Sequence, residues 1–559
     1  MGHGKSRAID RRQFVQASSV AAAALALGAT GCASSHPVAE TGGTTTQFVA
    51  GTYQATALGK KSDITVEVVF SDTAIDSVRV IDHGETERIA APAFEKIPEI
   101  IVASQSLAVD AVTGATLSSL ALLSAVEDCA RQADGDVSAL KRAEVPKEQP
   151  TDEEIECDLA VIGAGISGMA SALAAAQQGA KVVVFEKSSS MGGNALVSGG
   201  FIEYANAPEE LRVEVNDGYL KIFQEVLQFN RDAGLDASLV DEVQQQWDDY
   251  YANGNTKLFS SPEFLALQLC MLEGNTYDFQ HTYATDVEGG TAWLDTMQFP
   301  WMPLVAIPGY SWAHFSGSAE GVNGEGYFNV FEREMEGLDL RILFATPATE
   351  LITESDRVTG VIGSSANGNT YTVRAKDGVV IASGGYADNQ DMLKEHDKMW
   401  NWKDLDTFHC DNNYGHTGDG IRMATEAGAA FAELPFNQMV FPFVDTVLYA
   451  TETTVGTTNE SIYVNKAGKR FCDEGGSRTD MTIALMEQDG GVGFQVVDHD
   501  SSMITDGKTH TGMDVEYAIE RGILYRADTL EELATLMGVD ETTFCLLYTS
   551  PSPRDMRRS

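Results

Sequence analysis

Three short runs near residue 50 alternate polar and apolar positions and predict strands. They cover residues 52–57, 64–70 and 76–81. A period of two is typical of strands that bury one face, so the runs predict a half-buried sheet. Two helices are expected after them, one at about 91–104 and one that opens after residue 110 and ends near residue 133. Together these elements predict a small α+β domain.

A second pattern begins near residue 157, where continuous apolar runs replace the alternation. Residues 157–162 form one such run and 181–185 another, with a glycine-rich turn and a helix of small residues (169–178) between them. Strand, glycine turn, helix and strand in this order are typical of a dinucleotide-binding unit with a parallel sheet. The stretch 206–335 reads as helical, and its aromatic patches, such as Phe299–Trp301, are expected to lie in the core. The predicted fold class is therefore α/β, with a Rossmann-like domain behind the small α+β domain.

The first residues of the chain predict an export signal. Arg11-Arg12 precede Phe14 and an alanine-rich run that ends at Ala29. The run is shorter than the roughly 20 apolar residues that span a bilayer. The arginine pair resembles a twin-arginine signal, with an ordinary secretory signal or an uncleaved anchor as the alternatives. The residues before Cys32 resemble a bacterial lipobox, which would make Cys32 a lipidated first residue; an ordinary cleavage site is the alternative. We therefore expect a bacterial protein exported to the cell-surface or periplasmic side of the membrane.

Length, charge and cysteine spacing limit the number of domains and the kinds of partner and cofactor that the chain can have. The chain has 559 residues, which is too long for one core, so about two to four domains are expected. Its 82 acidic residues against 38 basic ones give a formal charge of −44, which would repel the backbone of a nucleic acid. The seven cysteines are scattered without a C-x-x-C pair. We therefore expect mostly buried thiols, and neither a c-type haem, a redox pair nor a metal site.

The segment from Asp110 to Thr116 carries the pattern D-x-x-[ST]-G-A-[ST]. This pattern resembles the FMN-binding domain of sodium-pumping NADH–quinone reductases and of some bacterial fumarate and urocanate reductases. The resemblance implies a covalent FMN, joined through a phosphoester bond to Thr116. Gly114 and Ala115 leave the approach clear, and a helix N-terminus stabilises a phosphate. The alternative is that Thr113 or Thr116 only caps the helix.

The glycine-rich turn is G-x-G-x-x-G, and it stands between a strand and a helix. In this context Gly163 makes the tight turn, Gly165 admits the pyrophosphate, and Gly168 lets the helix pack on the sheet. Glu186 ends the second strand, where its carboxylate can accept hydrogen bonds from ribose hydroxyls and would repel a 2′-phosphate. The turn therefore predicts a dinucleotide site.

The residues that follow indicate FAD rather than NAD. Gly192-Gly193-Asn194, Ser198-Gly199-Gly200, Ser383-Gly384-Gly385 and Thr417-Gly418-Asp419-Gly420 resemble the FAD domain of the fumarate reductase and succinate dehydrogenase flavoprotein family. With the FMN domain in front, the chain is most similar to soluble fumarate and urocanate reductases. The resemblance implies non-covalent FAD and adds these cofactor-binding residues to the glycine turn and Glu186: Lys187, Gly192, Gly193, Asn194, Ser198, Gly199, Gly200, Ala348, Gly384, Gly385 and Asp419.

The family also has an inserted α+β cap domain, whose motif is T-E, then V-N-x-x-G-K-R-F-x-x-E, then an arginine. Thr451-Glu452, residues 464–474 and Arg478 match it. The resemblance implies that Arg478 protonates the substrate alkene and that Glu452 returns the proton. An arginine has a pKa above about 12, so it needs such a relay and a rigid, dry site. A surface ion pair is the alternative for Arg478.

Two departures bear on the substrate. Fumarate reductases carry a histidine where this chain has Val440 or Phe441. The chain therefore lacks, at this position, a side chain that could carry a positive charge and bind a second carboxylate of the substrate. The second departure is in the proton relay: the position of an arginine in the family's relay aligns near Val455-Gly456, and neither residue is an arginine. We therefore expect urocanate or an aryl acrylate rather than fumarate, with Phe441 and Thr451 as substrate contacts, and electrons that arrive from an external or membrane donor. A flavin dehydrogenase of the ketosteroid type and an electron-transfer protein without its own substrate remain alternatives.

The last residues resemble translated adapter sequence, and the family's closing segment over the flavin is expected beyond them. A natural short tail is the alternative. The predicted boundaries are a signal at 1–32, a tether at 33–50, an FMN-binding domain at 51–134, a linker at 135–154, an FAD-binding domain at 155–424, an incomplete cap domain at 425–544 and a non-native tail at 545–559.

Overall fold

The structure is a computed structural model. It describes residues 47–147, 149–273, 276–307, 310–396, 400, 410, 412–413, 415–430, 455–456, 460–474, 478–509 and 513–549. The predicted signal at 1–32 and most of the predicted tether therefore lie outside the described residues. No helix of the described part combines the length and the apolar character needed to cross a membrane.

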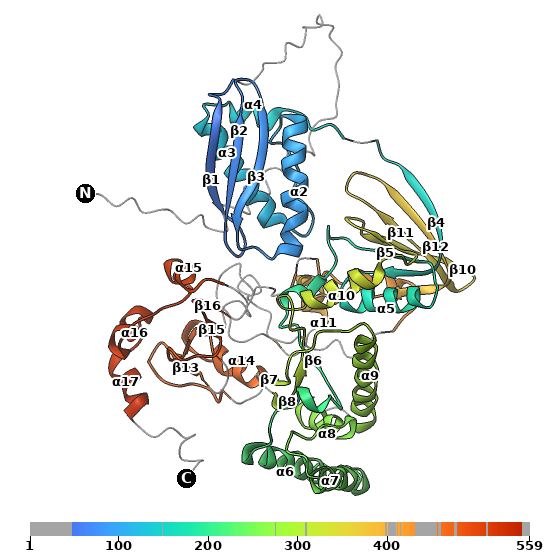
Figure 1. Ribbon diagram of the computed structural model, residues 1–559, viewed down its shortest axis with the longest axis vertical. Coiled ribbons are helices and arrows are strands. Elements are labelled where there is room, and N and C mark those ends of the chain that lie inside the picture. The colour runs from blue at the N-terminus through green and yellow to red at the C-terminus, as the bar shows by residue number, and fades with distance from the viewer. Residues whose placement is uncertain are drawn as a thin grey trace, which may run out of the picture. The chain divides into compact units, whose positions relative to one another are not determined.

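The first domain is a three-stranded antiparallel sheet with helices packed on it (Figure 1). Its elements are β1 (Gly51–Leu58), β2 (Asp63–Phe70), β3 (Ile75–His83), α2 (Glu87–Ser104) and α3 (Thr116–Gln132). Strand β2 buries every second side chain from Ile64 to Phe70, which is the alternation expected of a half-buried sheet. The three strands and two helices predicted for this region are confirmed.

One element stands inside the predicted linker at 135–154. Helix α4 (Val137–Arg142) begins after Asp136, whose carboxylate accepts a hydrogen bond from the Ala139 amide. Leu140 is buried in the core of the first domain, and its carbonyl accepts hydrogen bonds from the Leu107 amide and the Ser106 hydroxyl. The first domain therefore continues past residue 134.

The second domain is built on a six-stranded sheet of order β10-β11-β12-β4-β5-β9. The parallel strands are β12 (Thr370–Ile381), β4 (Asp152–Ile162), β5 (Val182–Phe185) and β9 (Leu340–Leu343), and β10 (Ala348–Glu354) and β11 (Arg357–Ser364) extend them antiparallel. Helix α5 (Ile166–Gln177) packs its Met169 and Leu173 against the sheet residues Val161 and Val184. This arrangement confirms the α/β prediction.

The four parallel strands end in register at one edge of the sheet. Ile381 of β12 lies beside Ile162 of β4, Ile162 beside Phe185 of β5, and Phe185 beside Leu343 of β9. Ligands of open α/β sheets bind outside the carboxyl ends of the strands. The segments that follow these four residues are therefore the place to look for a site.

The stretch 206–335 is mainly helical, as predicted. Its helices are α6 (Asp217–Asp232), α7 (Ala237–Ala252), α8 (Pro262–Glu273), α9 (Tyr277–Thr296) and α10 (Glu325–Met335). A small sheet of β6 (Ile202–Glu203), β8 (Tyr310–Ser316) and β7 (Val305–Ile307) accompanies them. Phe299 is buried and Trp301 packs against two apolar clusters, so the core role expected for these aromatic residues is confirmed.

The last part of the chain adds short elements. They are α11 (Gln390–His396), α12 (Asp419–Glu426), β13 (Ile462–Asn465), α14 (Arg478–Met486), β14 (Gly493–Val496), β15 (Ile504–Thr505), β16 (Lys508–Thr509), α15 (Val515–Glu520), α16 (Leu530–Met537) and α17 (Glu541–Thr549). Thr529 caps α16, and Phe544 of α17 is fully buried against that helix and β13. Helix α17 runs across the predicted boundary at residue 545.

Six cysteines lie in the described part of the chain, all with free thiols. Cys129, Cys157 and Cys270 are buried, and Cys410, Cys472 and Cys545 are partly exposed. Burial raises the pKa of the Cys129 and Cys157 thiols to about 11. The expectation of buried thiols therefore holds for three of these six.

Candidate flavin sites

The glycine turn after β4 is shaped for a phosphate. A Cβ on Gly163, at φ +101°, would lie 2.5 Å from the Ala382 carbonyl, and one on Gly168 would lie 1.9 Å from the Gly163 carbonyl. Around Gly165, by contrast, the space that a Cβ would enter is open to 4 Å. Gly165 is the N-cap of α5 and no side chain caps that helix, so the amides of its first turn are left for a ligand. A pyrophosphate fits this cradle.

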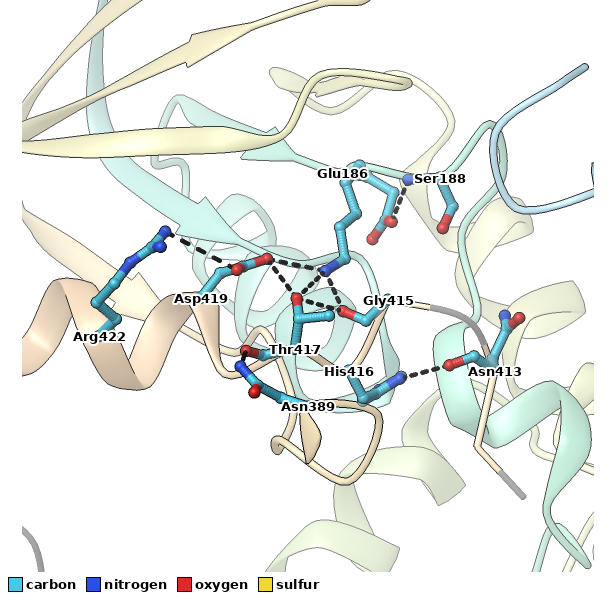
Figure 2. Close-up of polar contacts among 10 residues, drawn as sticks. Glu186, Ser188, Asn389, Asn413, Gly415, His416, Thr417, Asp419 and Arg422 are labelled. Carbon is cyan, nitrogen blue, oxygen red and sulfur yellow. Dashed lines mark hydrogen bonds and ion pairs between the residues drawn. The ribbon is translucent and has the colours of Figure 1, made fainter. Parts of the chain in front are cut away.

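Glu186 follows β5, the strand beside β4, and two hydrogen bonds hold its carboxylate in one position. It is 8% exposed, and its two carboxylate oxygens accept hydrogen bonds from the Ala164 and Ser188 amides, each at 2.7 Å. A carboxylate has about four lone pairs, so it can still accept bonds from ribose hydroxyls. Figure 2 shows Glu186 with Ser188 at the end of β5.

Lys187 joins the segment after β5 to the start of α12, where Figure 2 labels Gly415, Thr417 and Asp419. Its ammonium donates hydrogen bonds to the Gly415 carbonyl, to Asp419 Oδ2 at 2.9 Å and to Thr417 Oγ1 at 3.3 Å. The Thr417 hydroxyl donates to the same Asp419 oxygen at 3.0 Å. Burial opposes ionisation of Asp419, but the hydrogen bond and charge of Lys187 outweigh it, with Thr417 and Arg422 helping, and the pKa of Asp419 lies below its ordinary value.

The Gly192-Gly193-Asn194 loop lies beside the glycine turn. The Gly192 amide donates to the Ala164 carbonyl at 2.9 Å, and Gly192 and Gly165 form an isolated β-bridge. The Asn194 side chain accepts a hydrogen bond from the Asn413 amide at 2.8 Å. Segments about 30 and 250 residues from the turn thus meet at the carboxyl edge of the sheet.

The remaining predicted FAD contacts also lie near this edge. Ser198 Oγ accepts a hydrogen bond from the Gly200 amide, and Gly200, at φ +72°, packs its backbone against the Asn323 carbonyl. Gly385 follows β12, and its carbonyl accepts a hydrogen bond from the Gly418 amide at 3.1 Å. Ala348 begins β10, two residues after Thr346, whose amide donates to the Glu186 carbonyl.

The T-G-D-G motif predicted Asp419 as a cofactor contact, but the residues before the motif and Asn389 were not predicted. Gly415 and Thr417 bind Lys187, His416 Nδ1 donates to the Asn413 carbonyl at 2.8 Å, and the Asn389 amide donates to the Thr417 carbonyl. The signal available was the T-G-D-G motif itself, extended four residues toward the N-terminus.

The predicted catalytic group is described only in part. Arg478 is the first residue of α14. Four residues earlier, Glu474 is 1% exposed and accepts hydrogen bonds from Arg470 Nε at 2.8 and 3.0 Å and from the Tyr463 amide at 3.2 Å. The predicted relay and substrate residues Glu452, Thr451 and Phe441 lie outside the described residues. The catalytic arrangement of the cap therefore stays a prediction.

Thr116 lies in a pocket of the first domain. Lys60 and Lys61, from the turn between β1 and β2, line it together with Glu85. The N-cap of α3 is Ala115, and no side chain caps the helix, which removes the capping alternative for Thr113 and Thr116. Glu85 accepts hydrogen bonds from the Lys61 amide at 2.7 Å and the Ser118 hydroxyl at 2.5 Å, which fixes the wall of the pocket. Two lysines and open helix amides suit a phosphate on Thr116.

Comparison with known proteins agrees with the two flavin-binding domains. The family model for the FAD binding domain matches residues 158–537, and that for the FMN-binding domain matches residues 59–131. The chain is 30% identical to an NADH:acrylate oxidoreductase of Vibrio harveyi over 519 residues, which cover 88% of this chain and 50% of that protein. It is 29% identical to a urocanate reductase of Eggerthella lenta over 549 residues, which cover 95% of this chain and 81% of the relative.

Among solved structures, the open conformation of a flavocytochrome c3 fumarate reductase matches with a TM-score of 0.44 and 20% identity, over 71% of this chain and 61% of that one. The chain spans about half the length of the acrylate oxidoreductase that it matches. The chain therefore belongs to the FAD-dependent fumarate and urocanate reductase family, and it carries an FMN-binding domain in front of its FAD-binding domain.

Proposed function

We propose that this chain reduces the C=C bond of an α,β-unsaturated carboxylate, and that urocanate or an aryl acrylate suits it better than fumarate. The observation that carries the proposal is the gathering of the Gly163 turn, Glu186 and the Lys187–Asp419 pair at one sheet edge, in a chain that also has an FMN-binding domain. Relatives named for acrylate and urocanate support this choice of substrate class.

Each group of residues at the sheet edge has its own role in binding FAD. The amides at the start of α5 bind the pyrophosphate of FAD, Glu186 binds its ribose, and the Lys187–Asp419 pair fixes the turn that leads into α12. Bound FAD supplies the hydride, which goes to the carbon β to the carboxylate. Thr116 would hold FMN, which would relay electrons from an external or membrane donor.

Arg478 delivers the proton to the α carbon, and Glu452 returns it. An arginine gives up a proton only where it is held rigidly and reprotonated at once. The ion pair of the partly exposed Arg470 with the buried Glu474 supports that requirement, because it anchors the backbone one turn before α14. The reaction then balances: two electrons and two protons, one of them carried by the hydride, saturate the alkene.

The proposed side of the membrane rests on the N-terminal sequence. Arg11-Arg12 and the alanine-rich run act as a twin-arginine signal, and Cys32 carries a lipid in the mature protein. Such a location suits a reductase that serves anaerobic respiration. Mass spectrometry of the mature N-terminus, compared with a Cys32→Ala variant, tests this; an unmodified peptide that begins elsewhere would contradict it.

The activity is tested by anaerobic oxidation of reduced viologen with urocanate, cinnamates, acrylate and fumarate, on protein that carries both flavins. We expect turnover with urocanate or a cinnamate. Arg478→Ala should lose at least about 100-fold of that turnover with FAD still bound, whereas Arg526→Ala, at an arginine whose side chain is 62% exposed, should not.

Three outcomes contradict parts of this proposal. Full turnover in the Arg478→Ala protein refutes the role of Arg478. Consumption of none of the four acids favours an electron-transfer protein. Reduction of the flavin by a saturated ketosteroid favours the dehydrogenase alternative.

A further inference from the structure

We propose that His416 is a redox-linked proton acceptor of the FAD site, which takes up one proton when bound FAD is reduced. This role is separate from hydride transfer and from Arg478. It rests on FAD binding and not on the identity of the substrate.

The imidazole lies at the carboxyl edge of the sheet. A Cβ on Gly384, two residues beyond Ala382 at the end of β12, would lie 2.6 Å from His416 Cδ2 and 2.7 Å from Nε2. Gly384 has φ +76°, so the ring occupies the side where a residue other than glycine would place its side chain. The edge that carries Gly163, Glu186 and Gly384 therefore also carries a titratable ring.

The hydrogen bond of Nδ1 fixes the tautomer. Its partner at 2.8 Å is the Asn413 carbonyl, which can only accept, so Nδ1 carries the hydrogen and Nε2 of the neutral ring keeps a lone pair. No residue in the described part of the chain forms a hydrogen bond with Nε2. The Asn413 amide is held by Asn194 Oδ1, which keeps the ring in place. His416 is thus oriented, by the flavin-site loop itself, with a basic atom available.

The charges around the ring largely balance one another. Lys187 binds Gly415 and Thr417, which flank His416 in the sequence. The Asp419 carboxylate neutralises the Lys187 ammonium at 2.9 Å. Arg422 lies 3.9 Å from the second oxygen of Asp419. After β12, Tyr386 and Asp388 are also titratable, and the Asp388 amide donates to the His416 carbonyl. In the described part of the chain, the remaining titratable groups of α11 and α12 are Asp391, Lys394, Glu395, His396 and Glu426.

Against this balanced background, the largest change of charge at the edge comes with reduction. Two electrons and one proton leave the cofactor one negative charge richer, and a negative charge favours a protonated imidazole beside it. The imidazole then gains one proton from solvent through Nε2 and returns it when the cofactor is reoxidised. Reduction thus takes up two protons for two electrons, one on the cofactor and one on Nε2 of His416.

The test is a potentiometric titration of FAD at a series of pH values. The full chain carries Thr116→Val, so that only FAD titrates, and is compared with the same chain carrying His416→Gln. A glutamine amide can still donate to the Asn413 carbonyl but takes no proton. We expect a break in the slope of midpoint potential against pH in the parent, and a single slope in the His416→Gln chain. His499→Gln, at a histidine whose side chain is 90% exposed, serves as the control and should keep the break.

Two results overturn the proposal: a parent without a break, or a break that persists in the His416→Gln chain, which would assign it to the flavin's own ionisation. If the His416→Gln chain fails to hold FAD, the ring itself is followed in the parent. The NMR signals of ¹⁵N-labelled histidine, compared between oxidised and photoreduced protein, should show Nε2 of His416 protonated on reduction, and an unchanged His416 signal overturns the role.

Discussion

Replacing Lys187 with methionine should weaken FAD binding by about 30-fold. Lys187 is the side chain that ties the segment after β5 to the T-G-D-G turn, through the Gly415 carbonyl, Thr417 and Asp419. Methionine keeps most of the length and apolar bulk of the lysine stem and removes only the donor and the charge. In the variant, FAD must order by itself the two segments that Lys187 now holds together.

The magnitude follows from the contacts. The side chains of Lys187 and Asp419 are 31% and 33% exposed, so solvent screens the pair and its contribution is about 1 kcal/mol. The Gly415 carbonyl and the Thr417 hydroxyl also lose a donor, which costs about another 1 kcal/mol. A total of about 2 kcal/mol corresponds to about 30-fold in Kd.

The assay is the Kd of FAD, measured by fluorescence quenching during titration of the apoprotein. Lys376→Met is the matched control, because Lys376 is 75% exposed and meets Asp158 only at 3.6 Å. It removes the same charge from the chain without touching the site. An unchanged Kd in the Lys187→Met protein, or an equal loss in the Lys376→Met protein, would refute the reasoning.

Three further predictions concern the same two sites. Gly168→Ala should lose at least tenfold in FAD affinity, since its Cβ would lie 1.9 Å from the Gly163 carbonyl, whereas Gly289→Ala, in open space on α9, should bind FAD normally. Thr116→Val should abolish the covalent flavin seen as in-gel fluorescence, and Thr113→Val should keep it; fluorescence retained on the Thr116→Val chain would contradict the attachment site. Because the pKa of Asp419 is lowered in the fold, its stabilisation is present above the ordinary aspartate pKa of about 3.9 and is lost as the pH falls through the lower folded value. The Tm deficit of Asp419→Asn should therefore be largest near pH 7 and fade below about pH 4, and a deficit that grows in acid would contradict this sign.

Local patterns predicted the elements that make the site, because each depends on neighbours in sequence. Alternation identified β2, and the glycine spacing identified the turn between β4 and α5. The start of α2 was placed four residues late, at about residue 91, whereas the helix begins at Glu87 and contains Pro92 and Pro98. Helix α4 was not predicted, because its polar surroundings outweighed the one buried Leu140.

Long-range partners were beyond such patterns. Lys187 and Gly415 are 228 residues apart, and only the fold of the parallel sheet brings their segments to one edge. His416 is a single titratable residue beside a motif, and its role depends on contacts with Asn413 and Gly384 that no spacing reveals. The sequence predicted the cofactor sites, and the structure shows which residues join the segments that form them.

The central claim is that FAD at this edge passes a hydride to an unsaturated carboxylate. Its most direct test is a single turnover: photoreduced protein, free of other reductant, is mixed with urocanate or a cinnamate in an anaerobic stopped-flow instrument. We predict that the oxidised FAD spectrum returns and that one equivalent of the saturated acid forms for each FAD reoxidised. A flavin that stays reduced with every acid tried, or that reoxidises without the saturated product, would contradict the claim.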